Sequence, residues 1–482
     1  MTPVVPALST LDDVRQLLAA HDPKGQLVTC GLRDLVVGPG ALLALPATVS
    51  ALVGEELGRR ARVTLLVDET VILREGRDVK AEVESALAVD CEVTRVTLSD
   101  GPSDLHVVQE VIEVARAGCA GADVVVALGG GTISDIGKLA ADGPGVRLVT
   151  VMTAASVDGY TDDVSVTLKQ GVKRTVPSRW PDVVLGDAET VAGAPARMTR
   201  SGYGEMTSMY VAPADWRLAA LMGAGSAYHD GPVALLQALA GQLDSCAVGV
   251  AASEPAAVQT LTWALALRGI ATGVAGTTAC LSGVEHLVSH MLDLRAAQLE
   301  LPTGLHGEQV GVGSVVAACA WEMLDERLAA DPGARVRQAE LDLPQAEFRV
   351  RAAFDGLDPS GRIGGECWND YARKLGGLRV AEPQINAVLA AWAEHREVLR
   401  ALVRPSQVIA RGLRSAGAPV VFDDLDSGVD ALTARWAVTN CALMRDRFTV
   451  VDLLTVLGWW ESADVDEVLE RVTAAVSATV GA

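Results

Sequence analysis

The sequence has no excess of positive charge. It contains 61 aspartates and glutamates against 40 lysines and arginines, which gives a formal charge of −21. A surface this acidic repels nucleic acids and anionic lipids, so we expect neither kind of partner. A small phosphorylated substrate is still compatible with this composition, because a local basic pocket is enough to hold one.

Cysteine pairs, targeting signals and long apolar runs are missing as well. The eight cysteines are scattered without a C-x-x-C motif, as expected for buried thiols in a reducing compartment. No apolar run reaches the roughly 18 residues of a transmembrane helix, and the amino terminus has no basic region followed by an apolar core. We therefore predict a cytoplasmic protein without a membrane-spanning segment.

The first part of the chain alternates between strand and helix patterns. Ser9 and Thr10 precede a helical lead-in, and further helices are expected at 42–57 and from near Ser103 to Ala117. After a short strand that begins at Leu35, buried strands are expected at 63–68, 92–98, 123–128 and 146–151. Continuous β-branched runs of this kind are typical of a parallel sheet covered on both faces.

Two segments depart from this alternation. Residues 161–187 have the pattern of an antiparallel excursion, with a turn at Lys169-Gln-Gly. After Pro195 the strand signal fades and helical patterns continue nearly to the end. A chain of 482 residues is long enough for two to three domains. We therefore predict an α/β domain over residues 1–190 and a helical domain over residues 191–482.

A glycine turn links the strand at 123–128 to a helix. Its sequence, Gly129-Gly-Gly-Thr-Ile-Ser-Asp-Ile-Gly-Lys138, lets the backbone approach a pyrophosphate that the amino end of the helix attracts. Most glycine triplets are only tight turns, but a position between strand and helix favours phosphate binding. Asp68, at the end of an earlier strand, is a candidate for the adenosine ribose and favours NAD over NADP; the alternative is a solvated carboxylate.

Two further segments carry candidate polar groups. Met152-Thr-Ala-Ala-Ser-Val-Asp-Gly-Tyr160 follows a strand and brings hydroxyls and one carboxylate. Lys173 and Arg174 are the best local basic pair for a phosphate group, with a solvated hairpin edge as the alternative.

Three of the seven histidines lie in one short segment. His286 and His290 are four residues apart, so they share one face of a helix, and His306 follows after a short connection. Imidazoles that converge with a carboxylate make a site for a divalent ion with an open position. Alone, the pair is equally compatible with inert histidines, because no H-E-x-x-H motif accompanies it.

Several motifs follow one another in order along residues 35–460. They are Gly-Gly-Gly-Thr-x-x-Asp-x-x-Lys138, Thr153-Ala-Ala-Ser-x-Asp-Gly, Gly-Val-Lys173-Arg-Thr, Ala194-Pro-x-x-Met-x-x-Ser-Gly-Tyr-Gly-Glu205, Asp215-Trp216, Gly-x-Glu-His286-x-x-Ser-His, His306-Gly-Glu-Gln-Val-Gly-Val-Gly and Met444-Arg-Asp-Arg-Phe-Thr449. Their order resembles the sn-glycerol-1-phosphate dehydrogenases, most closely the bacterial branch. That family is grouped with glycerol dehydrogenases, iron-containing alcohol dehydrogenases and dehydroquinate synthases.

The resemblance implies a dehydroquinate synthase-like fold: a parallel-sheet dinucleotide-binding domain, a helical metal-binding domain, an active site in the cleft between them, and commonly a homodimer. It also implies NAD or NADP as cofactor and one divalent metal ion, which we expect to be Zn or Ni. Carried over by position, the metal ligands are Glu205, His286 and His306. The cofactor would contact Gly129, Gly130, Gly131, Thr132, Asp135, Thr153 and Ser156.

Two positions depart from the family pattern. Glu205 stands where the family dehydrogenases have Asp, and Met209 stands where they have Lys, which removes a positive charge. Dehydroquinate synthases use Glu at the first position, but they carry lysines where this chain has Ser208 and Val164. Metal binding is compatible with these changes, whereas the substrate is left open.

The expected activity is hydride transfer that interconverts dihydroxyacetone phosphate and sn-glycerol 1-phosphate, or a related polyol phosphate. One alternative is an NAD- and metal-dependent sugar-phosphate cyclase, a lyase that eliminates phosphate. Another is a non-catalytic protein that binds nucleotide or metal. In the dehydrogenase, Asp158 would orient substrate hydroxyls, His290 would relay the proton, Lys173 or Arg174 would hold the phosphate, and Glu285 and Glu308 would support the histidines.

Overall fold

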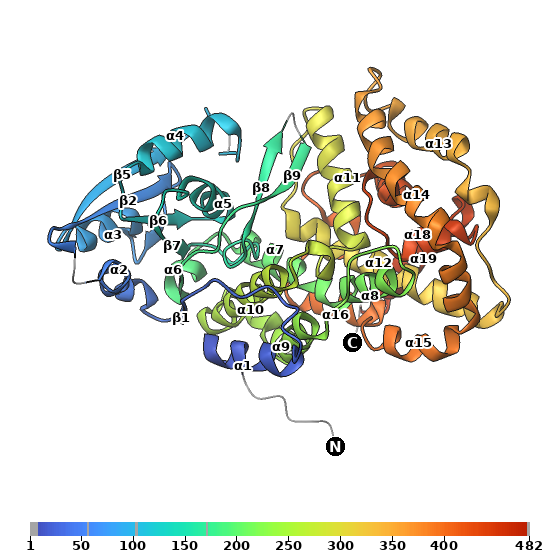
Figure 1. The fold of residues 1–482 in the computed structure, drawn as a ribbon, viewed down its shortest axis with the longest axis horizontal. Coiled ribbons are helices and arrows are strands. Elements are labelled where there is room, and N and C mark those ends of the chain that lie inside the picture. The colour runs from blue at the N-terminus through green and yellow to red at the C-terminus, as the bar shows by residue number, and fades with distance from the viewer. Residues whose placement is uncertain (1–7, 55–56, 102–104, 170–171, 480–482) are drawn as a thin grey trace. The chain divides into compact units, whose positions relative to one another are not determined.

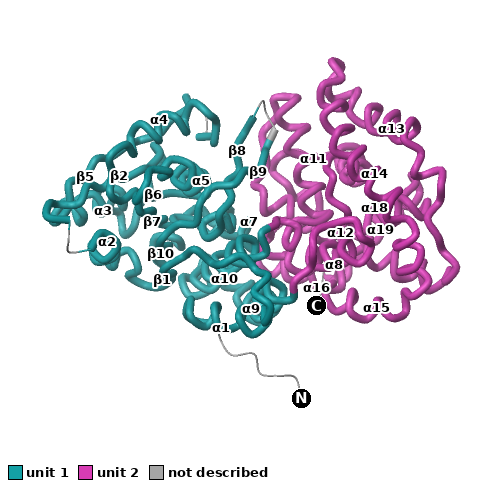
Figure 2. The backbone as a smooth tube through the Cα atoms, in the orientation of Figure 1, with its two compact units in different colours: residues 1–203, 230–276 teal, residues 204–229, 277–482 magenta. Residues whose placement is uncertain are grey.

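The computed structural model describes residues 8–54, 57–101, 105–169 and 172–479 (Figure 1). Its backbone forms two compact units (Figure 2). Unit 1 comprises residues 1–203 and 230–276, and unit 2 comprises residues 204–229 and 277–482. The domain boundary expected near residue 190 stays a prediction.

Unit 1 is organised around a six-stranded parallel sheet with the order β1-β10-β7-β6-β2-β5. Its strands are β1 (Asp34–Gly38), β2 (Ala61–Asp68), β5 (Cys91–Leu98), β6 (Val124–Gly129), β7 (Arg147–Met152) and β10 (Val183–Asp187). Two small hairpins accompany it, β3 (Leu73–Arg74) with β4 (Arg77–Asp78) and β8 (Val164–Lys169) with β9 (Val172–Pro177). The predicted α/β class with a parallel sheet is confirmed.

Strand β10 corrects one expectation. Residues 161–187 do not form a single antiparallel excursion, because only β8 and β9 are antiparallel. β10 instead runs parallel to β1 and β7 and lies between them. All five of its residues are buried, as a strand in the interior of a covered sheet requires.

Helices cover both faces of this sheet (Figure 1). On one face, α2 (Leu45–Val53) and α3 (Val79–Leu87) pack on alternate strand residues such as Val124 and Val126. On the other, α4 (Gln109–Cys119) and α5 (Gly131–Ala140) pack on Val125 and Ala127. The continuous apolar run of β6 is therefore used on both faces. α2 is shorter than expected because Gly54, with φ +75°, ends it. The expected start of the next helix near Ser103 lies outside the described residues.

Further helices belong to unit 1. α9 (Asp230–Ala251) packs against α10 (Pro255–Ala275), and α10 also packs against β1, β10 and α6 (Ala188–Ala192). α1 (Leu11–His21) packs on α9 and begins as predicted, with Asp13 N donating to Thr10 Oγ1 at 3.1 Å. By length and composition α9 is the described helix that would suit a membrane span, but such a helix is common inside a packed unit.

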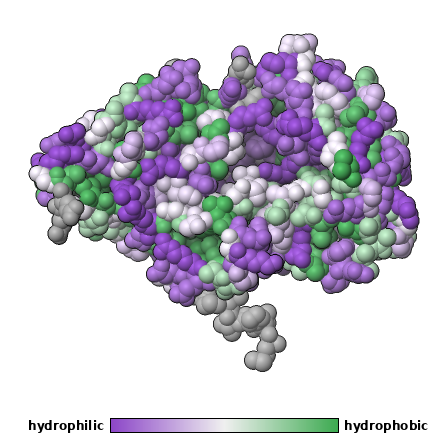
Figure 3. Space-filling model, in the orientation of Figure 1, coloured by the Kyte–Doolittle hydropathy of each residue, from purple (hydrophilic) through white to green (hydrophobic). Residues whose placement is uncertain are grey.

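Unit 2 is helical, with no strand within residues 204–229 or 277–479. It contains the end of α7 (Ala196–Met206), and α8 (Ala212–Leu221), α11 (Val284–Gln298), α12 (His306–Ala330), α13 (Leu343–Asp355), α14 (Arg362–Ala390), α15 (Trp392–Arg400), α16 (Ser406–Ser415), α17 (Ala431–Asn440), α18 (Val450–Val456) and α19 (Ser462–Ser477). α12 is its central helix, because α11, α16, α18 and α19 all pack on it. Hydrophilic residues are spread over the visible face of both units (Figure 3), in keeping with the acidic composition.

Candidate active site

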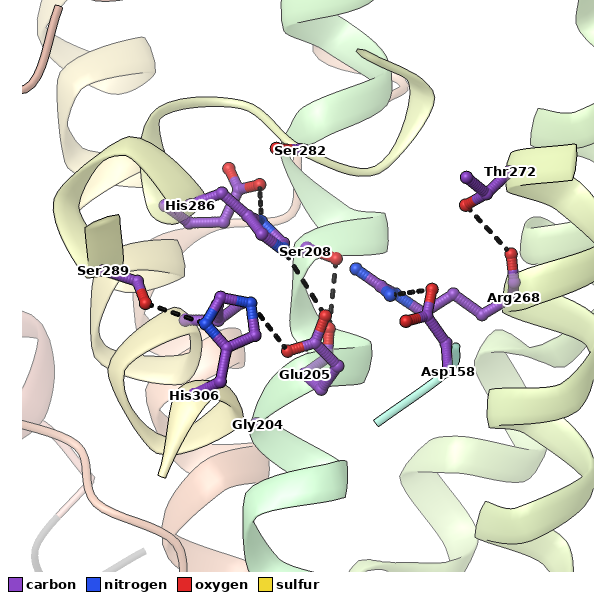
Figure 4. Close-up of polar contacts among 12 residues, drawn as sticks. Asp158, Gly204, Glu205, Ser208, Arg268, Thr272, Ser282, His286, Ser289 and His306 are labelled. Atoms are coloured by element: carbon purple, nitrogen blue, oxygen red, sulfur yellow. Dashed lines mark hydrogen bonds and ion pairs between the residues drawn. The ribbon is translucent and has the colours of Figure 1, made fainter. Parts of the chain in front are cut away.

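Three side chains with metal-binding groups converge in unit 2. Glu205 lies near the end of α7, His286 in the first turn of α11, and His306 at the first residue of α12. Glu205 Oε1 is 3.3 Å from His286 Nε2, and Glu205 Oε2 is 3.7 Å from His306 Nε2 (Figure 4). Glu205 and His286 are buried, and the side chain of His306 is 24% exposed. The cluster is therefore largely removed from solvent.

Glycines allow the helices that carry these residues to approach one another. A Cβ atom on Gly204 would lie 2.2 Å from the Gly307 carbonyl oxygen, and one on Gly313 would lie 2.7 Å from the Glu285 carbonyl oxygen. A larger residue at either position would force two helices apart. The glycine-rich approach to Glu205 therefore serves close packing of α7 on α12.

A buried carboxylate holds the second ring nitrogen of His286. His286 Nδ1 is 2.8 Å from Glu285 Oε1, while Nε2 faces Glu205. Such a partner fixes the ring orientation and the nitrogen that carries the proton. Glu285 thus lies where a supporting residue was predicted. Glu308 is buried on α12, and its support of a histidine stays a prediction.

A hydroxyl takes the corresponding position at His306. The Ser289 hydroxyl is 3.0 Å from His306 Nδ1 and donates to Gln309 Oε1 at 2.7 Å (Figure 4). Because that hydrogen goes to Gln309, the Ser289 oxygen accepts from His306 Nδ1–H, and the other ring nitrogen, Nε2, faces Glu205. Ser289 was missed as a supporting residue, although its place between His286 and His290 on the helix is the signal that marks it.

The electrostatics of the cluster favour a positive charge. Burial lowers the pKa of His286, but the hydrogen bonds and charges of Glu205 and Glu285 raise it by more, so its pKa lies above the usual 6.5. A cation between these carboxylates is therefore stabilised. A proton on Nε2 and a bound metal ion compete for that place.

The donor set fits a divalent metal ion. The ligand atoms of Glu205, His286 and His306 lie within 4.8 Å of one another. Donors held about 2.1 Å from a tetrahedral metal are about 3.4 Å apart, so small side-chain movements suffice to close the set. One carboxylate and two imidazoles leave a fourth position for a substrate oxygen.

His290 lies one turn further along α11. Its ring centroid is 6.3 Å from that of His286 and 5.8 Å from that of His306. His286 and His290, which were predicted to share a helix face, have neighbouring rings, and the His306 ring at the start of α12 lies near both. His290 is not a member of the group whose ligand atoms could hold a single ion, so it is placed beside that group.

In unit 1, residues predicted to bind the cofactor gather at the carboxyl edge of the sheet. Strand β5 lies on one side of β2, and the next strand of the sheet along the chain, β6, lies on the other side. The direction in which strands are added to the sheet therefore reverses between β2 and β6. Leu66 of β2 pairs with Ala127 of β6, which places Asp68 and Gly129 at the ends of neighbouring strands. Open parallel sheets bind ligands at such a reversal.

The glycine turn leaves room for a ligand at one position. A Cβ atom on Gly130 would meet no atom within 4 Å, whereas one on Gly129 would lie 2.7 Å from Ile133. Thr153 N donates to the Gly129 carbonyl at 3.2 Å, and Thr153 and Ser156 are buried just after β7. The open backbone and the amino end of α5 suit a pyrophosphate, as predicted for this turn, where Gly131 and Thr132 begin α5.

Both predicted carboxylates of this site have lysine partners. Lys80 Nζ is 2.6 Å from Asp68 Oδ1, and the Asp68 side chain is 21% exposed, so Asp68 is not a solvated strand end. Lys138 Nζ is 3.2 Å from Asp135 Oδ1, and Val166 N donates to Asp135 Oδ2 at 3.1 Å. Contact of either carboxylate with a cofactor stays a prediction.

The predicted substrate residues of unit 1 lie on a loop and a hairpin. Asp158 forms an ion pair with the buried Arg268 of α10 (Figure 4). Arg268 was missed, although it is the only charged residue in the apolar segment Pro255–Ala275. Lys173 lies on β9 opposite Leu168, with Arg174 opposite Thr167, and their contact with a phosphate stays a prediction.

The chain is similar in part of its sequence and in its fold to the iron-containing alcohol dehydrogenases. The family model described as "Iron-containing alcohol dehydrogenase" matches residues 36–195. A probable glycerol dehydrogenase from Sinorhizobium meliloti superposes with a TM-score of 0.55 at 18% identity, over 94% of this chain and 98% of its own. Maleylacetate reductase from Rhizobium sp. strain MTP-10005 has a TM-score of 0.54 at 18% identity, over 93% and 98%. These structures share the fold.

Two proteins of similar sequence show which family the chain belongs to. The glycerol-1-phosphate dehydrogenase [NAD(P)+] of Natronomonas pharaonis is 32% identical over 328 residues, which cover 68% of this chain and 86% of the relative. The enzyme of the same name from Bacillus velezensis is 25% identical over 334 residues, which cover 69% of this chain and 70% of the relative. The chain belongs to the glycerol-1-phosphate dehydrogenase family, and the resemblance drawn from its motifs is confirmed.

Proposed function

We propose that this protein is a metal-dependent, NAD(P)-linked dehydrogenase that interconverts dihydroxyacetone phosphate and sn-glycerol 1-phosphate. The observation that carries the proposal is the cluster of Glu205, His286 and His306 in a chain of this family. We further propose that NAD is the preferred cofactor, that Zn or Ni is the metal, and that the enzyme works as a cytoplasmic homodimer.

Different residues would bind the metal ion and transfer the proton. Glu205, His286 and His306 would hold a metal ion, which would supply a Lewis acid for the reacting oxygen of the substrate, and a bound reduced nicotinamide would supply the hydride. His290 takes up or releases the proton of the substrate hydroxyl, because it lies beside the ligand cluster without belonging to it.

Residues of unit 1 bind the substrate. Asp158 accepts hydrogen bonds from the substrate hydroxyls, and its ion pair with Arg268 holds the carboxylate in place. Lys173, supported by Arg174, binds the phosphate through its ammonium group. Asp68, Asp135, Thr153 and Ser156 line the cofactor side, around the open turn at Gly130.

The cyclase alternative rests on Glu205 alone. Its expected lysines are absent: Val164 begins β8, and Ser208 donates its hydroxyl to the Glu205 carbonyl at 3.0 Å instead of offering a cation. The two activities differ in cofactor balance. A dehydrogenase consumes one NADH for each product molecule, whereas a cyclase needs NAD only in catalytic amounts and releases phosphate.

The test is a turnover assay with metal-reconstituted protein, dihydroxyacetone phosphate and NADH, followed by absorbance of the reduced nicotinamide. His286→Ala should abolish both metal binding and NADH oxidation. His290→Ala should retain the metal but turn over about 10²–10⁴-fold more slowly. His395→Ala, on α15, is the matched histidine control and should behave as wild type. NADH oxidation that survives in His286→Ala, or phosphate release without NADH loss in the wild type, would reject the proposal.

A further inference from the structure

We propose that Glu285 is the positioning residue of the metal centre: its buried carboxylate fixes the proton of His286 on Nδ1 and so directs Nε2 toward the ion. The inference rests on the proposed function only in that Glu205, His286 and His306 bind a metal. It goes further by assigning the orientation of one ligand to a residue that does not touch the metal.

The geometry at the start of α11 is specific to this task. Neighbouring residues on a helix normally point apart, yet Glu285 Oε1 lies 2.8 Å from His286 Nδ1. The same oxygen accepts from Gly283 N at 2.7 Å, which pins the carboxylate to the first turn. A carboxylate only accepts hydrogen bonds, so Nδ1 must be a donor, and Nε2, which faces Glu205, is the nitrogen at which a metal ion can replace a proton.

The second carboxylate oxygen shows that Glu285 is not placed for helix capping alone. Glu285 is fully buried, and its Oε2 has no hydrogen-bond partner among the described residues. Burial of a carboxylate oxygen without a hydrogen-bond partner costs free energy. A capping carboxylate on the solvated surface would not have this cost. The cost is offset if the charge of Glu285 strengthens a metal–imidazole bond.

A rigid frame holds this first turn in place. Asp215 of α8 accepts from Val284 N at 3.1 Å and, through its other oxygen, from Val450 N at 3.0 Å and Trp321 Nε1 at 3.1 Å. The carboxylate of Asp215 therefore joins α11, α12 and α18.

A half-buried cation completes the frame. Arg447, which precedes α18, donates to the Ser282 carbonyl and to Thr278 Oγ1 at 2.6 Å, and its charge interacts with that of Glu285. Lys374 of α14 donates to the Arg447 carbonyl at 3.1 Å. The motif at 444–449 thus acts on the metal centre indirectly, by bracing the turn that carries Glu285 and His286.

The test measures metal affinity of full-length apo-protein with Zn²⁺ in competition with a chromophoric chelator, without substrate or NADH. Glu285→Leu should weaken affinity about 100-fold and Glu285→Gln about 10-fold, because the amide oxygen can still accept from Nδ1 but carries no charge. The d–d absorption of Co²⁺-loaded protein should change in Glu285→Leu, which reports a reoriented ligand.

Asp182→Asn is the matched control. It removes a buried carboxylate of unit 1, whose Oδ2 accepts from Arg179 Nη2 at 2.9 Å instead of from a histidine. Affinity of Glu285→Leu equal to that of Asp182→Asn would overturn the inference. If Glu285→Leu does not fold, the comparison of Glu285→Gln with Asp182→Asn decides in the same way. If the wild type binds Zn²⁺ but does not oxidise NADH, the proposed function is rejected. The comparison of Zn²⁺ affinities still tests the role of Glu285 in that case.

Discussion

Replacing Lys138 by Met should be one of the most damaging single changes in unit 1. The Lys138 side chain is buried, and its ammonium lies 2.6 Å from Asp162 Oδ1 and 3.2 Å from Asp135 Oδ1. It also donates to the Gly159 carbonyl at 2.9 Å and to the Val164 carbonyl. The ammonium therefore ties the loop after β7 to α5.

The magnitude follows from the charges that Met would leave behind. Breaking a buried ion pair by removing one partner costs about 3–5 kcal/mol, because the other charge stays buried without compensation. Lys138→Met leaves two such carboxylates. Asp162→Asn alone should cost less, because Asp135 still balances the ammonium. The double variant Lys138→Met/Asp162→Asn should be more stable than the sum of the single effects predicts.

The cost should also depend on pH. Burial raises the pKa of Asp162 to about 7 although Lys138 lowers it, so the pKa rises further once the ammonium is gone. Between the unfolded value of 3.8 and this raised value, the native state binds more protons than the unfolded state, so the free energy of unfolding falls as pH rises. The penalty of Lys138→Met should therefore be larger near pH 8 than near pH 5.

The assay is urea denaturation combined with hydrogen exchange by mass spectrometry, which reports the stability of the segment at 158–166 separately from unit 2. Lys169→Met, at an exposed lysine at the end of β8, is the control and should change stability by less than about 0.5 kcal/mol. A Lys138→Met penalty below about 1 kcal/mol, unchanged between the two pH values, would refute the reasoning.

Two glycine substitutions and metal removal give further outcomes. Gly283→Ala should weaken Zn²⁺ affinity, because its Cβ would lie 2.4 Å from Asp215 Oδ2 and 3.0 Å from Glu285 Oε2; an unchanged chelator titration would contradict this. Gly130→Ala should keep the melting temperature of the wild type, since its Cβ meets no protein atom, yet weaken NADH binding at least about 10-fold in a fluorescence titration. If Gly130→Ala and the wild type bound NADH with equal affinity, the pyrophosphate would not bind at that turn. Treatment with EDTA should abolish NADH oxidation, and Zn²⁺ or Ni²⁺ should restore it; activity that persists without metal would contradict the assigned chemistry.

Much of the architecture is present in local sequence patterns. The β-branched run of β6 and the glycines after it predict a buried strand that opens into a helix, because strand burial and backbone room are properties of neighbouring residues. The spacing of His286 and His290 likewise predicts a shared helix face. β10 was assigned wrongly, because a five-residue apolar strand has no period that tells a parallel neighbour from an antiparallel one.

The partners of the buried charges were decided only by the tertiary structure. Asp158 pairs with Arg268, and Asp215 joins residues that are far apart in the sequence. The residue types alone identify candidate ligands, since carboxylates and imidazoles bind metal ions wherever they converge. Which of them converge depends on helix packing permitted by Gly204 and Gly313, a steric property of chains brought together by folding. The sequence thus determined the chemistry available to the site, and the packing determined which groups can act together.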